Sequence, residues 1–130
     1  MNELDNVTLD KTSFSWRDIR GRDKWDTFTV TATLTVVGTP TYSGRVRFNG
    51  RKCEFQITLV ASTSIASTAG TSYVDLPVAA TGLTGMAVMS NDTTNIAVGV
   101  CHVDVAGSKC YLPAQTASGN TFNVTGWFEV

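Results

Sequence analysis

Apolar and polar residues alternate most regularly from residue 42 to residue 60, and Asn49-Gly50 divides this stretch in two. Asn-Gly suits a two-residue hairpin turn because both residues adopt positive φ readily, so the sequence predicts two antiparallel strands joined at this point. Such a turn would pair Phe48 with Arg51. One face of the predicted hairpin is then largely apolar and the other polar, so turn chemistry and hydrophobic pattern agree.

Alternation predicts several further strands. Residues 27 to 37 have apolar side chains at the even positions and threonine at almost every odd position, which is typical of one long strand with one buried face. Shorter patterns predict strands within residues 71–78, 83–90, 96–105, 108–113 and 120–130. We expect a bulge between Val100 and Cys101, where the alternation slips, and another at Gly126.

The pattern as a whole indicates an all-β fold. It contains about eight strands, with turn signals about every 8 to 12 residues, and shows no helical periodicity. We therefore predict an antiparallel β-sandwich of about eight strands, jelly-roll-like, with an N-terminal extended arm. The length of 130 residues suits a single such domain. The expected division is an arm for assembly contacts at residues 1–26 and the β-sandwich domain at residues 27–130.

The first 26 residues differ from the rest because they hold about half of the charged residues of the chain. A flexible linker would lack their aromatic side chains, so we expect the arm to be ordered by packing, either on its own domain or on a neighbouring subunit. Trp and Arg often dominate the binding energy of interfaces. The candidate assembly contacts are Phe14, Trp16, Arg17, Arg20, Arg22 and Trp25.

Composition and charge exclude several classes of function. The formal net charge of −1 provides no field that would attract nucleic acid or an anionic membrane. No apolar run is long enough to span a bilayer, and the polar N-terminus is unlike a signal peptide, so we expect folding in a cytoplasm. Three cysteines without a CxxC motif favour buried thiols over a disulfide framework or a zinc site. We expect no cofactor.

Candidate catalytic residues are few. His102 is the single histidine, and the adjacent Cys101 should point to the opposite face of a strand, so the two would not form a nucleophilic dyad. Asp104 shares the face of His102, but no third metal ligand is near in the sequence. The motifs of serine hydrolases, zinc proteases and P-loop proteins are absent. We predict a protein that is not an enzyme, although a pair of scattered carboxylates could still be assembled by folding.

Four of the basic residues cluster near the predicted turn, namely Arg45, Arg47, Arg51 and Lys52. Charged side chains on a strand can simply deter edge-to-edge aggregation. Alternatively, arginines in such a cluster bind a phosphate, an anionic sugar or an acidic partner surface. The cluster is therefore a possible surface binding site, and without interleaved aromatic residues it is not expected to bind nucleic acid.

Residues 40–130 resemble a domain found at the C-termini of bacteriophage and prophage tail fibre and tailspike proteins. The matching features are the hairpin sequence, a Leu-Pro-x-x-x-x-Gly element downstream and the closing segment SGNTFNVTGWFEV. The matching positions are Tyr42, Gly44, Arg45, Gly50, Arg51, Leu76, Pro77 and Gly82. The resemblance implies a jelly-roll-like sandwich that assembles as a homotrimer in a virion and meets other virion proteins or a host surface glycan.

We therefore expect a non-enzymatic virion structural protein of the tail fibre or receptor-binding type, without membrane insertion. Tail fibre domains usually end a long fibre, whereas here only a short arm precedes the sandwich, so a capsid decoration protein is an alternative. A carbohydrate-binding module is a further alternative, because sandwiches often bind sugars on one sheet face. In that case Tyr73, Tyr111 and Trp127 could line the site.

Overall fold

The structure, a computed structural model, describes residues 24–80 and 84–130, and within these residues it contains strands and no helix. The all-β prediction is confirmed. The strands are β1 (Asp26–Phe28), β2 (Ala32–Thr33), β3 (Thr35–Val37), β4 (Thr41–Asn49), β5 (Lys52–Val60), β6 (Ser64–Ser67), β7 (Tyr73–Asp75), β8 (Gly85–Asn91), β9 (Ile96–Asp104), β10 (Lys109–Tyr111), β11 (Gln115–Ser118) and β12 (Thr121–Glu129).

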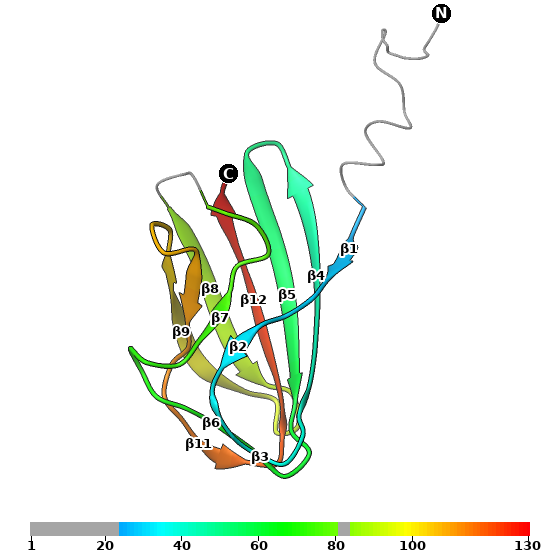
Figure 1. Cartoon of the computed structure of the whole chain (residues 1–130), viewed down its shortest axis with the longest axis vertical. Helices are drawn as coiled ribbons and strands as arrows, with labels where there is room; N and C mark the ends of the chain where they lie inside the picture. The colour runs from blue at the N-terminus through cyan, green and yellow to red at the C-terminus, as the bar shows by residue number, and fades with distance from the viewer. Residues whose placement is uncertain (1–23, 81–83) are drawn as a thin grey trace, which may run out of the picture.

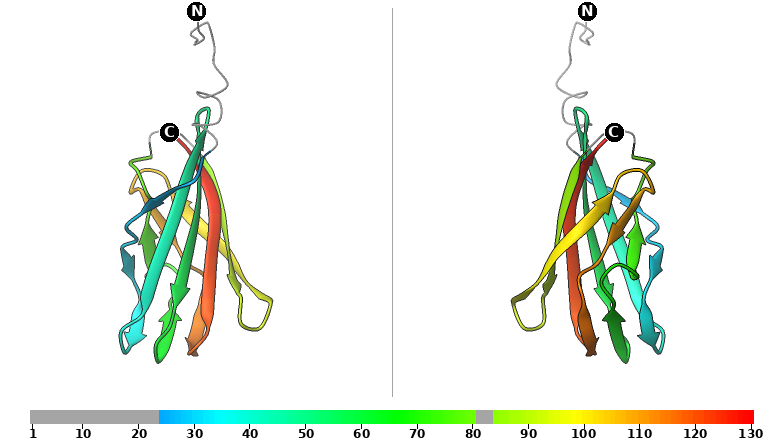
Figure 2. Two further views of the ribbon diagram at one scale, coloured as in Figure 1. Left: turned by 90° about the vertical axis from the view of Figure 1, so that its right-hand side faces the viewer. Right: turned by 90° about the vertical axis from the view of Figure 1, so that its left-hand side faces the viewer.

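Most of these strands belong to one curled antiparallel sheet of nine strands in the order β1-β4-β5-β12-β8-β9-β10-β7-β2. The strands β7 and β2 thereby return across the inner side of β5 and β12 (Figures 1 and 2). The remaining strands form a small sheet, β11-β6-β3, at the end of the curled sheet away from the β4–β5 turn (Figure 1). An eight-stranded jelly-roll sandwich is not confirmed by this arrangement.

The first described segment bridges the two edges of the curled sheet. The prediction of one long strand over residues 27–37 is wrong, because this segment forms three short strands that pair with three different partners: β1 with β4, β2 with β7, and β3 with β6. Its apolar residues Phe28, Val30, Ala32 and Leu34 nevertheless pack against the core. The alternation identified the buried side of the segment, but it held no information about its neighbours.

The β4–β5 hairpin is present, but its predicted register is wrong by two residues. Phe48 pairs with Cys53 instead of Arg51, so the two turn residues are Gly50 and Arg51. Gly50 has φ +65° and Arg51 has a negative φ, which is the pattern of a type II′ turn with glycine at its first central position. A shift of two residues preserves the side-chain parity, so the faces are as predicted.

The core lies inside the curl, and β12 runs through its centre in continuous register with β5 and β8. The ring centroids of Phe55 and Phe128 lie 6.0 Å apart. The buried apolar residues are Val46, Cys53, Phe55, Ile57, Leu59, Ile65, Val74, Leu76, Ala87, Met89, Cys101, Val103, Cys110, Leu112, Phe122, Val124 and Phe128.

The predicted bulge at Gly126 is absent, and the bulge predicted in β9 lies at a different position. The register of β12 is continuous through Gly126, where an added Cβ would collide with the Met86 carbonyl oxygen and with Ala87. Glycine therefore allows close approach of β8 there. The irregularity of β9 lies opposite Met89 and Ser90, so the unpaired residue is Val98 instead of one at Val100 or Cys101.

Candidate functional site

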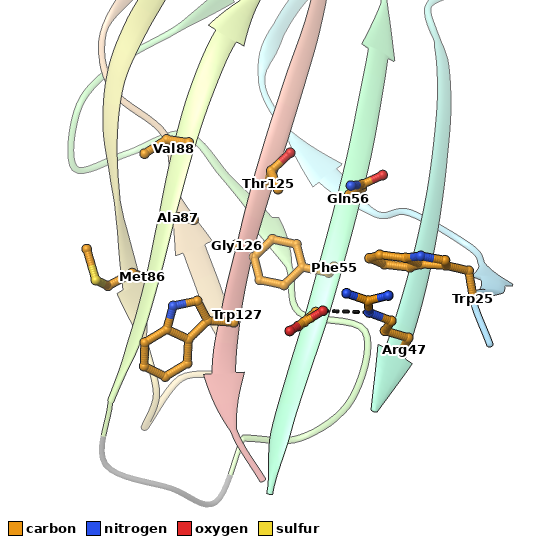
Figure 3. A pocket seen from close by; sticks show the side chains of 11 residues that line it. Trp25, Arg47, Phe55, Gln56, Met86, Ala87, Val88, Thr125, Gly126 and Trp127 are labelled. Atoms are coloured by element: carbon orange, nitrogen blue, oxygen red, sulfur yellow. Dashed lines mark hydrogen bonds and ion pairs between the residues drawn. The ribbon is translucent and has the colours of Figure 1, made fainter. Parts of the chain in front are cut away.

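The best candidate site lies on the outer face of the curled sheet, which the alternate residues of β4, β5, β12 and β8 form. The strand registers arrange these residues in two adjacent rows. The first row consists of Arg47, Glu54, Trp127 and Met86, and the second of Arg45, Gln56, Thr125 and Val88. Figure 3 shows the side chains of this region above the sheet.

Trp25 closes the β4 edge of the outer face. It directly precedes β1, and its indole ring contacts two arginines of β4: the Cζ atoms of Arg45 and Arg47 lie 4.8 Å and 4.7 Å from the ring centroid. Figure 3 shows the ring beside the Arg47 guanidinium. Cation–π contacts of this kind are worth about 0.5–1 kcal/mol each at exposed sites. The structure thus brings together the last aromatic residue of the predicted arm and half of the predicted basic cluster.

Hydrogen bonds across β4 and β5 fix the orientation of both arginines. Arg47 Nε donates to Glu54 Oε1 at 2.6 Å, and Arg45 Nε donates to Gln56 Oε1 at 2.8 Å. The side chains of the Arg47–Glu54 ion pair remain 35% and 24% exposed, so this pair contributes little to stability. Its main effect is to hold the two charged groups in place.

Two adjoining hollows on this face form what we call the groove. The first, of about 370 Å³, lies between Trp25 and Trp127 and is mainly apolar. The second, of about 350 Å³, is more polar than the first, and Gln56 lines both. The first is also lined by Arg47, Glu54, Phe55, Met86, Ala87, Val88, Thr125 and Gly126. The second is lined by Thr27, Ser43, Gly44, Arg45, Gln56, Thr58 and Asn123.

The members of the predicted basic cluster have different surroundings. Arg45 and Arg47 line the groove, and Lys52 places its Nζ atom 4.7 Å from the ring centroid of Trp127. Arg51 lies in the turn, where its carbonyl oxygen accepts a hydrogen bond of 2.9 Å from the backbone of Val130. The predicted assembly contacts Phe14, Trp16, Arg17, Arg20 and Arg22 lie outside the described residues.

Tyr73 and Tyr111, which sequence reasoning grouped with Trp127, lie apart from the groove. They belong to β7 and β10, and their rings pack edge to face with centroids 5.4 Å apart. His102 lies 6.3 Å from Tyr111, and a hollow of about 400 Å³ adjoins these two side chains. The three predicted sugar-binding aromatic residues therefore do not form one site.

The cysteines are all buried and free, as the sequence predicted. Burial, together with the nearby charge of Glu54, raises the pKa of the Cys53 thiol from 9.0 to about 11. A hydrogen bond between the other two thiols lowers the pKa of Cys101 and raises that of Cys110. Cys101 is buried whereas His102 is exposed, which confirms that they face opposite sides. Reactive cysteines are usually accessible, so these thiols have a structural role.

Within residues 24–80 and 84–130, no group of three or more His, Cys, Asp or Glu side chains is placed to hold a metal ion. The same residues include no helix with the length and hydrophobicity needed to cross a bilayer.

Sequence reasoning missed the polar residues of the groove. Thr58, Thr125 and Asn123 are ordinary polar positions of alternating strands, and β12 is more than 60 residues away from β5 in the chain. The available signal was that these residues alternate with buried residues and should therefore lie on the same outer face as Trp127. It could not be used without knowing that β12 lies between β5 and β8.

Comparison of the chain with models of known protein families, with curated proteins and with solved structures found no match.

Proposed function

We propose that this chain is a non-enzymatic structural protein of a bacteriophage virion, of the tail fibre or receptor-binding type. Its β-domain is exposed at the particle surface, and its N-terminal arm anchors it to other virion proteins. The observation that carries this proposal is the contact of Trp25 with Arg45 and Arg47. This contact attaches Trp25, near the end of the arm, to the sheet. If a neighbouring protein holds the arm, the contact also fixes the orientation of the groove.

Two of the motif positions behind the resemblance, Gly50 and Gly44, have identifiable roles in the hairpin. Gly50 adopts the positive φ of the turn, and Gly44 lies beneath Phe28 and Val30, where an added Cβ would come within 2.7 Å of both side chains. Gly44 therefore allows the segment after β1 to cross β4. These roles support a shared local structure with tail fibre and tailspike domains.

The finer parts of the proposal follow from the same resemblance. They comprise an eight-stranded jelly-roll-like sandwich as the underlying topology, a homotrimer as the assembly, and the virion as the location after synthesis in the host cytoplasm. The proposed partners are further copies of this chain and other virion proteins, without a cofactor, nucleic acid or membrane insertion.

Deletion of residues 1–24 tests the anchoring role. We expect the shortened protein to keep the circular dichroism spectrum of a β-protein and to be absent from purified particles, because the arm provides the anchor. Normal incorporation of the shortened protein would reject the proposal. The variant Lys109→Gln, which changes a cation on β10, a strand that pairs with neither β1 nor β4, is the control and should enter particles normally.

Electron microscopy of particles distinguishes the proposed role from capsid decoration. Density for the protein at a fibre tip supports the tail fibre type. Density distributed over the capsid lattice would instead support the alternative of a decoration protein.

A further inference from the structure

We propose that the groove binds an acidic oligosaccharide of at least two pyranose rings, one of which carries a carboxylate. The polar hollow would hold the carboxylate, and the hollow beside Trp127 would hold the neighbouring ring. The inference rests on the proposed function only for the source of the sugar, which is the surface of the host bacterium. The groove itself follows from the residues on the outer face.

Arg45 is the residue suited to the carboxylate. Its Nε atom is engaged by Gln56 and its guanidinium is stacked on Trp25, so the terminal NH₂ groups are the donors that a ligand can meet. A guanidinium held in one orientation can bind a carboxylate through two parallel hydrogen bonds. Because the side chain is ordered before binding, little conformational entropy is lost when the ligand arrives.

The charge balance of the groove favours an anion. Glu54 is the one carboxylate among the described residues that line the two hollows, and Arg47 is paired with it at 2.6 Å. The charge of Arg45 is not balanced in this way, since its partner Gln56 is neutral. Lys52 lies above Trp127 but lines neither hollow and is paired in register with Glu129, so it does not add to the positive charge of the groove.

The remaining polar residues suit sugar hydroxyl groups. Asn123 Nδ2 donates to Thr58 Oγ1 at 3.4 Å, and Thr125 Oγ1 donates to Asn123 Oδ1 at 2.8 Å, so amide and hydroxyl groups form a connected line. Each of these groups can both donate and accept hydrogen bonds, as sugar hydroxyl groups do. An apolar segment bound here would leave the remaining donors and acceptors of these groups without partners, which is unfavourable.

Trp127 offers a surface for the second ring. Figure 3 shows its indole beside Met86. The strand registers place Glu54 between Trp127 and Arg47. The C–H face of a pyranose ring is apolar and can pack on such a ring once the flexible Lys52 side chain, whose Nζ atom lies 4.7 Å from the ring centroid, has moved aside. Since β5 alone separates β4 from β12, and Arg45 and Trp127 lie in rows two residues apart along the strands, their backbones are about 12 Å apart, a span that two linked rings with their carboxylate can bridge.

An array of oligosaccharides containing galacturonate, glucuronate or sialate, each printed beside its carboxyl-reduced form, tests the proposal with the full chain. We expect acidic members to be bound, and titration of the best of them in solution should show at least about tenfold weaker affinity for its reduced form, a difference of about 1.4 kcal/mol. If no acidic member of the array is bound, or if the acidic and reduced forms are bound with equal affinity, the proposal is wrong.

Three variants assign the roles. Arg45→Gln should reduce the affinity for the acidic form to that for the reduced form, whereas Trp127→Ala should weaken both. Lys109→Gln, with a cation removed outside the groove, should bind as the wild type does. Melting temperatures identify a variant that is merely unfolded, and Arg45→Lys, which retains charge without the planar fork, should bind the acidic form with intermediate affinity.

This test is independent of the arm. Glycan binding by the purified protein combined with normal particle entry of the arm deletion would reject the anchoring role and keep the groove. Particle entry that depends on the arm, without glycan binding, would keep the anchoring role and reject the proposal for the groove.

Discussion

The inner and outer faces of β5 and β12 are formed by alternate residues of the same two strands, yet their physical roles differ. On the inner face Phe55 and Phe128 are fully buried against each other. On the outer face Glu54 and Trp127 are half-buried neighbours beside a groove. Burial of apolar area stabilises the fold, whereas exposed polar contacts contribute little net free energy. Substitutions on the inner face should therefore mainly change stability, whereas substitutions on the outer face should mainly change binding.

The largest effect should come from truncation of an inner residue. Phe128→Ala removes a fully buried ring that lies against Phe55, and we expect it to lower the free energy of unfolding by about 3–5 kcal/mol. Urea denaturation measures this loss. The adjacent Trp127→Ala on the outer face should cost less than half as much, because its ring is partly exposed. Equal losses from both variants would contradict the separation of the faces.

Alkaline pH should weaken the inner face through Cys53. Because the folded-state pKa of about 11 lies above the ordinary value of 9.0, the folded protein retains the thiol proton while the unfolded chain loses it. This contribution is fully present below about pH 9 and is lost as the pH rises to about 11, at a rate of up to about 1.4 kcal/mol per pH unit.

The comparison of the wild type with Cys53→Ala isolates this contribution. Urea denaturation between pH 8 and pH 11 should show a smaller decline for the variant, while other groups that titrate in this range affect both proteins alike. Parallel pH profiles would show that Cys53 ionises equally in the folded and unfolded states.

The smallest effect should be that of the ion pair on the outer face. A double-mutant cycle with Arg47→Gln and Glu54→Gln should give a coupling energy of about 0.2–1 kcal/mol, because both side chains are partly exposed. The coupling should also decrease in high salt. A coupling comparable to the loss in Phe128→Ala would mean that the outer face is as important for stability as the core.

The sequence predicted side-chain parity better than strand neighbours. The faces of the hairpin were predicted correctly although the turn is Gly50-Arg51 instead of Asn49-Gly50. Each residue of β4 pairs with a β5 residue two positions beyond the predicted partner, and a shift of two preserves parity. In residues 27–37 the alternation identified the buried side but not the three partner strands. The groove was predicted only in part, through Arg45, Arg47 and Trp127, since its polar residues lacked a distinctive pattern.

The sequence by itself determined the all-β class, the buried faces and the position of the hairpin, because alternation and turn chemistry act between residues close in the chain. Only the tertiary structure decided that β12 lies between β5 and β8 and that Trp25 reaches the arginines of β4. Pairing of distant strands depends on how all the apolar faces are buried together, and no local pattern specifies that choice.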